Sequence, residues 1–104
     1  MRMPMNDYQV LIHGKNFLVS KDSISSKHGF YTNIYVRAEN ERQAELAAVE
    51  VLRINESLRK SVQNREDDPP RVFAEEIQEI SNYDNIQPKQ QGITWYEEKE
   101  SENA

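Results

Sequence analysis

The stretch FYTNIYVRA at residues 30–38 alternates without a break between mostly apolar side chains and polar or tyrosine side chains. Such alternation predicts a strand that buries one side against a core and leaves the other side open. The expected core side consists of Phe30, Thr32, Ile34, Val36 and Ala38. The expected open side consists of Tyr31, Asn33, Tyr35 and Arg37.

A helix signature follows this strand directly. Asn40 is a favourable N-cap residue, and Gln43 three positions later completes a capping-box pattern. Apolar side chains then recur at helical spacing, so we expect one long helix over residues 40–64, with a bend or restart at Asn55. The predicted apolar stripe comprises Ala44, Ala47, Ala48, Val51, Leu52, Ile54, Leu58 and Val62, whereas Leu46 and Val49 point away from it.

The N-terminal part of the chain predicts further strands. Residues 8–13 alternate, with Tyr8, Val10 and Ile12 on one side and Gln9, Leu11 and His13 on the other. Residues 14–16 (Gly-Lys-Asn) form a turn signal, and residues 17–19 form a second short strand or an extension of the first. The polar, serine-rich residues 20–27 are expected to form a loop.

The segment after the helix is ambiguous. Asp68 and the prolines at 69 and 70 end the helix, because proline cannot continue it. Residues 71–80 have apolar positions at helical spacing, but a domain with one helix needs more than two strands to be stable, so we predict a strand here. Residues 81–91 form a polar connection. Residues 92–96 are expected to form a short final strand, whose Trp95-Tyr96 pair attaches this end to the core.

These elements predict an α+β fold of two layers in the order β-β-β-α-β-β. One long helix would cover one face of an antiparallel or mixed sheet. The predicted domain spans residues 1–96. Residues 97–104 are acidic and nearly free of apolar side chains, so they are expected to be a disordered C-terminal tail.

Several features of this layout resemble a group of small, uncharacterised bacterial α+β proteins, a domain of unknown function. The features are turn glycines, the central strand, the alanine face of the helix, and the PP and EEI segments. The residues that carry the resemblance are Gly14, Asn16, Phe17, Gly29-Phe30-Tyr31-Thr32, Val36, Ala38, Ala44, Ala48, Pro69-Pro70 and Glu75-Glu76-Ile77. The resemblance implies this domain layout and no established activity.

Composition excludes several classes of function. The 104 residues contain no Cys, which excludes disulfides, thiol catalysis and Cys-ligated metals. No run approaches the roughly 18 apolar residues of a membrane helix, and residues 1–9 lack the apolar centre of a signal peptide. We therefore expect a cytoplasmic protein without membrane contact. Five basic and two acidic residues make residues 1–37 locally basic in a chain with a net charge of −5.

Catalytic motifs are missing from the sequence. His13 and His28 each precede a glycine, and they could meet at one end of the sheet near Asp22 or the Glu75-Glu76 pair, as a small enzyme would require. The alternative is that both histidines are surface turn residues. The sequence contains no HxH or HExxH spacing that would favour a metal site instead. Adjacent glutamates on a strand point to opposite faces, so they do not readily share an ion. We expect no metal, no cofactor and no catalytic residue.

The predicted open sheet face is the most informative surface. Its binding candidates are His13, Tyr31, Asn33, Tyr35 and Arg37, with Gln9 and Leu11 beside them. Tyrosine and arginine are enriched at protein interfaces, so we expect a protein partner or a homodimer formed through this face or an edge strand. The alternatives are a solvated face or a stacking platform for single-stranded nucleic acid or a small ligand, although the face has little positive charge for a phosphate backbone.

Overall fold

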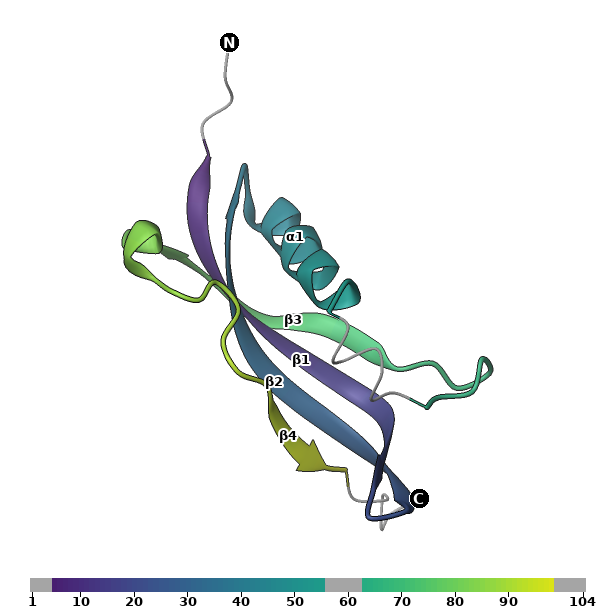
Figure 1. The fold of residues 1–104 in the computed structure, drawn as a ribbon. Coiled ribbons are helices and arrows are strands. Elements are labelled where there is room, and N and C mark those ends of the chain that lie inside the picture. The colour runs from purple at the N-terminus through teal and green to yellow at the C-terminus, as the bar shows by residue number, and fades with distance from the viewer. Residues whose placement is uncertain (1–4, 56–62, 99–104) are drawn as a thin grey trace.

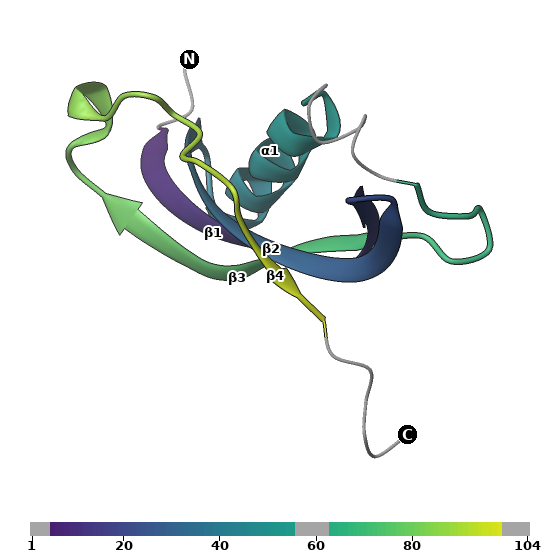
Figure 2. The same cartoon turned by 60° about the horizontal axis from the view of Figure 1, so that its bottom comes forward.

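The computed structural model describes residues 5–55 and 63–98. Four strands form one antiparallel sheet in the order β3-β1-β2-β4, and the single described α-helix lies across one face (Figures 1 and 2). The elements are β1 (Asn6–Lys21), β2 (Ile24–Ala38), α1 (Glu41–Arg53), β3 (Arg71–Ile80), the short 3-10 helix η1 (Tyr83–Asn85) and β4 (Thr94–Glu97). The two-layer α+β architecture is confirmed, and within the described residues no helix is long and apolar enough to cross a membrane.

The strand order differs from the prediction, because residues 14–16 are not a turn. They form a bulge inside β1, where the register with β2 shifts between Gly14 and Phe17 and Asn16 adopts a φ of 64°. Gly14 is required there, since a Cβ atom would lie 2.2 Å from the ring of Phe30. β1 is therefore one continuous strand, and the observed order is β-β-α-β-β.

The loop predicted for residues 20–27 is also wrong. β1 and β2 form a long hairpin whose turn contains only Asp22 and Ser23, with φ values of 53° and 67°. A two-residue turn with both φ values positive matches the right-handed twist of paired strands, so it connects them directly. Of the serines that suggested a loop, Ser23 lies in the turn, and the others lie on strand positions near the hairpin tip, where Ser20 and Ser25 are exposed and Ser26 is partly buried.

The core lies between α1 and the sheet, on the side that the alternation predicted. Val10, Ile12, Phe30 and Ile34 are at most 1% exposed, and Ala44 and Ala48 of the helix pack against them with no exposure at all. The small alanine side chains let the helix approach the sheet closely, and Leu52 fills the space at its C-terminal end. Tyr8, Thr32, Val36 and Ala38 are also buried, as expected.

The helix begins as predicted and ends earlier. The Asn40 side chain accepts a hydrogen bond from the Gln43 backbone N–H at 2.9 Å, but α1 stops at Arg53. Ile54, predicted to lie in the apolar stripe, is 66% exposed because it is the C-cap residue. Val49 was expected to point outward and instead packs partly against the core. Leu58 and Val62 lie outside the described residues.

The strand predicted at residues 71–80 is confirmed as β3, which pairs with β1 along its length. At the opposite edge, β2 pairs with β4 and with the segment before it, where the Tyr35 N–H donates to Lys89 O and the Gln91 N–H donates to Asn33 O. Glu97 ends β4 and the Glu98 N–H donates to Lys27 O, so regular pairing extends past the expected domain boundary at residue 96. Residues 99–104 of the predicted tail lie outside the described part of the chain.

Candidate functional site

On the sheet face opposite α1, η1 contacts the far end, where Tyr83 and Asp84 meet Arg37, and no other described helix or strand covers this face. We call it the open face. Residues paired across the strands define successive rows on it. The central row is His13, Tyr31 and Phe73; the basic row is Lys15 and Arg71; and the acidic row is Leu11, Asn33 and Glu76.

An aromatic cluster occupies the central row. The imidazole of His13 stacks on Tyr31 with 4.2 Å between ring centroids and 21° between planes. The rings of Phe73 and Tyr96 lie 5.2 and 5.8 Å from the same imidazole. His13 is only 5% exposed, whereas Tyr31 is 37% exposed. Four residues from four different strands thus form an aromatic surface with a buried histidine at its centre.

Tyr96 reaches this cluster from β4 by crossing over Gly29 of β2. A Cβ atom at Gly29 would lie 2.2 Å from the phenol ring and hydroxyl, so only glycine leaves this path open. The Tyr96 hydroxyl then lies 2.5 Å from Nε2 of His13, at hydrogen-bond distance. Burial raises the pKa of Tyr96, and the negative charges of Glu98 and Glu75 add to the effect. The phenol is therefore held in its neutral, hydrogen-bonding form.

Glu75 comes to the other side of the imidazole because of a bulge in β3. The register passes from Leu11 opposite Glu76 to Ile12 opposite Ala74, which leaves Glu75 as the additional residue. Its carboxylate lies 3.6 Å from Nδ1 of His13, just beyond hydrogen-bond distance, and Nδ1 has no hydrogen-bond partner. A proton on Nδ1 would face this carboxylate, leaving Nε2 to accept a hydrogen bond from the Tyr96 hydroxyl.

The five predicted binding residues share the open face, as expected, but they lie in different regions of it. His13 and Tyr31 meet in the aromatic cluster, and the Asn33 carboxamide accepts a hydrogen bond from Gln9 at 3.3 Å. Arg37 lies at the far end of the face, where it pairs with Asp7 at 2.6 Å and Asp84 at 3.3 Å and contacts the ring of Tyr83. Its hydrogen bond to Asp7 raises the guanidinium pKa above its already high ordinary value. Tyr35 lies between these two regions and is half-buried.

Sequence reasoning missed the contributions of Phe73 and Tyr96 to this face. Trp95 attaches β4 to the core by edge contacts with Phe30 and Phe17, as expected, but its neighbour Tyr96 points to the opposite side. The sequence signal was available in principle, because adjacent strand residues alternate faces. Placing Tyr96 beside His13 also required the strand order, which the sequence did not reveal.

The two histidines do not form a joint catalytic site. His13 belongs to the open face, whereas the ring of His28 contacts Trp95 on the side of Phe17 and Phe30. The Glu75 carboxylate and the Tyr96 phenol lie beside different nitrogens of the His13 imidazole, but the raised pKa of Tyr96 opposes the loss of its proton. Among the described residues, no three His, Asp or Glu side chains gather as metal ligands would.

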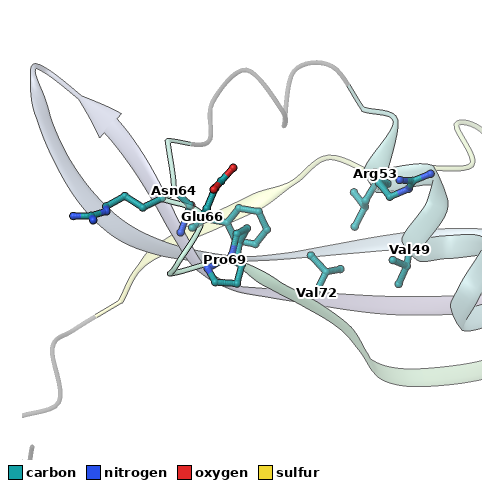
Figure 3. A pocket seen from close by; sticks show the side chains of 10 residues that line it. Val49, Arg53, Asn64, Glu66, Pro69 and Val72 are labelled. Atoms are coloured by element: carbon teal, nitrogen blue, oxygen red, sulfur yellow. The ribbon is translucent and has the colours of Figure 1, made fainter.

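A separate hollow of about 680 Å³ lies on the other side of the sheet, at the C-terminal end of α1 (Figure 3). Val49, Leu52 and Val72 contribute apolar walls, and Asn64 and Pro69 close it from the following loop. This loop is fastened to the bulge of β1 by hydrogen bonds among Asn16, Lys27, Asn64 and Asp68. The chain leaves the described part at 55 and returns at 63 beside this hollow, so we assign no ligand to it.

Comparison of the chain with protein-family models, curated proteins and solved structures found no match. The resemblance to a bacterial α+β group therefore stays a prediction from the sequence.

Proposed function

We propose that this protein is a small, non-enzymatic interaction protein that self-associates through the open face. The observation that carries the proposal is the aromatic cluster, in which the exposed ring of Tyr31 stacks over the buried His13 on the open face. Tyrosine and other aromatic residues supply large contact areas at small entropic cost and are enriched at the centres of protein interfaces. A homodimer and a cytoplasmic location are parts of this proposal.

The sheet edges are less suited to association than the face. The outer edge of β2 is occupied by β4 and by the segment of residues 89–91. On the outer strand β3, the Ala74 N–H already donates to the Glu45 carboxylate of α1 at 3.1 Å. The same strand carries Glu75, Glu76 and Glu79, and like charges oppose pairing between two copies of one strand.

The charges of the open face argue against a nucleic-acid platform. Arg37, the basic residue of the predicted platform, is compensated by Asp7 and Asp84. Glu75 and Glu76 place negative charge next to the aromatic cluster. Lys15 and Arg71 have no ion pair with a described residue, but two basic side chains beside these glutamates are a small footprint for a phosphate backbone, which requires positive charge along its whole path.

Sedimentation velocity over a dilution series of the wild-type chain tests the proposal. We expect a reversible dimer in the micromolar range, with Tyr31→Asp raising the dissociation constant at least about tenfold. Leu46→Asp is the matched control, since Leu46 is 55% exposed on the helix, away from the open face, and its substitution should leave association unchanged. A wild-type chain that stays monomeric at high micromolar concentration overturns the proposal, whatever the variants do.

A further inference from the structure

The charged residues beside the aromatic cluster are arranged asymmetrically along the strands. Lys15 and Arg71 form the basic row on one side of the central row, and Glu76 supplies the charge of the acidic row on the other side. Arg71 and Glu76 are exposed, and neither has an ion pair with another described residue. Five positions separate them along β3, so they lie far beyond ion-pair distance of each other in one chain.

We propose that a second copy of this chain docks on the open face about a two-fold axis that crosses the strands at the central row. This inference rests on the proposed self-association and adds its geometry. The residues that contribute most to binding usually lie near the centre of an interface, and the central row is the most aromatic part of the face. A two-fold axis through it stacks the aromatic clusters of the two copies on each other.

The axis also determines which charges meet. A rotation about it keeps each strand over the same strand of the second copy and exchanges the two flanking rows, which lie one row spacing of about 7 Å from the central row. Arg71 of each copy therefore faces Glu76 of the other, and the contact occurs twice. Lys15 comes over Leu11 and Asn33 of the second copy, where its aliphatic part can cover the leucine.

The bulge at Glu75 is compatible with this arrangement. Glu75 lies between Phe73 and Glu76 along β3, so the rotation carries it to a position between Phe73 and Arg71 of the second copy. Its carboxylate would then share the guanidinium of Arg71 and the imidazole of His13, instead of meeting its own symmetry mate. The two sheets would pack face to face with their mean strand directions within about 30°, as in other aligned sheet pairs.

Charge reversal and its rescue test this geometry in solution. We expect Arg71→Glu and Glu76→Arg each to weaken the dimer about tenfold, because each creates two like-charge contacts across the axis. The double variant Arg71→Glu/Glu76→Arg should return to within about threefold of the wild type, since it restores both pairs in reversed order. Arg42→Glu on the exposed side of α1 changes the net charge as Arg71→Glu does and should leave the dimer unchanged.

A cysteine experiment gives an independent measurement, because the natural chain contains no cysteine. Under mild oxidation, a mixture of the Arg71→Cys and Glu76→Cys chains should form mixed disulfide dimers faster than either chain alone. Two results would overturn the two-fold geometry and leave the proposed function standing. One is a wild-type dimer combined with a double charge variant that dimerises more weakly than both single variants. The other is equal cross-linking in all samples. A wild-type monomer overturns both the geometry and the proposed function.

Discussion

The hydrogen bond between Tyr96 and His13 provides the most direct test of how β4 is held. His13 is 95% buried, its Nδ1 has no hydrogen-bond partner, and the Tyr96 hydroxyl is the partner of Nε2. Tyr96→Phe removes only this hydroxyl and keeps the ring that contacts His13 and Tyr31. The substitution therefore leaves a buried imidazole without a hydrogen bond to any other described residue.

The expected loss of stability follows from leaving the buried His13 imidazole without a hydrogen bond. A buried polar group left without a partner destabilises a fold by about 1–3 kcal/mol, whereas an exposed hydroxyl contributes within about 0.5 kcal/mol. Tyr31→Phe is the matched control, because it removes a phenol hydroxyl from the same cluster at a 37% exposed position. In urea unfolding at one fixed protein concentration, we expect Tyr96→Phe to lower the free energy of unfolding by about 2 kcal/mol more than Tyr31→Phe.

A double variant separates the hydrogen bond from the packing of the ring. When both partners become apolar, no buried polar group is left unpaired, so His13→Leu/Tyr96→Phe should be less destabilised than the sum of the two single variants. Equal stability of Tyr96→Phe and Tyr31→Phe would refute the reasoning, since it would mean that the hydroxyl contributes nothing to the buried imidazole. Strict additivity in the double variant would refute the coupling between the two residues.

Three further predictions follow from other parts of the structure. Gly29→Ala should destabilise the fold by about 1–3 kcal/mol in urea unfolding, because its Cβ would collide with the Tyr96 ring, whereas Gly92→Ala, with nothing within 4 Å, should be nearly neutral. Leu52→Ala should cost about 2–5 kcal/mol in thermal unfolding at a 2% exposed core position, and an equal loss from Leu46→Ala, at 55% exposure on the same helix, would contradict the assigned helix face. Because the pKa of Tyr96 is raised in the folded chain, the unfolded chain releases the phenol proton first as pH rises above about 10. The free energy of unfolding should therefore fall between that pH and the folded pKa. Denaturant titrations at alkaline pH should show a smaller fall for Tyr96→Phe than for the wild type.

Local patterns predicted the faces of the elements well. The alternation from Phe30 to Ala38 placed each core residue correctly, and Asn40 marked the start of the helix. These features depend on the period of the side chains and on local hydrogen bonds. Both are determined within a single short segment of the sequence. The hairpin tip was predicted wrongly because polar composition does not distinguish an exposed strand from a loop. Positive φ values at Asp22 and Ser23, which neither residue requires by itself, produced the tight turn.

The candidate site was only partly predictable, since it depends on register between distant strands. The sequence placed His13 and Tyr31 on one face, but their direct pairing follows from the position of the hairpin turn. Glu75 approaches His13 only because β3 contains a bulge, and Tyr96 does so only because β4 pairs beside Gly29. Neither the bulge in β3 nor the pairing of β4 with β2 is visible in a local sequence pattern. The aromatic cluster could therefore not be predicted from the sequence.

The composition of the central row favours the proposed interaction face over an ordinary solvated one. A sheet face adapted to water carries polar side chains in every row, as the row of Gln9, Tyr35 and Gln78 largely does. In the central row, a histidine is desolvated under Tyr31 while Tyr31 itself stays exposed. An imidazole left in water keeps its hydrogen bonds to solvent. Burying it without a hydrogen-bond partner for Nδ1 costs free energy, which other interactions must offset. In the proposed dimer, the second copy would supply these interactions by covering Tyr31 and bringing Arg71 toward Glu75.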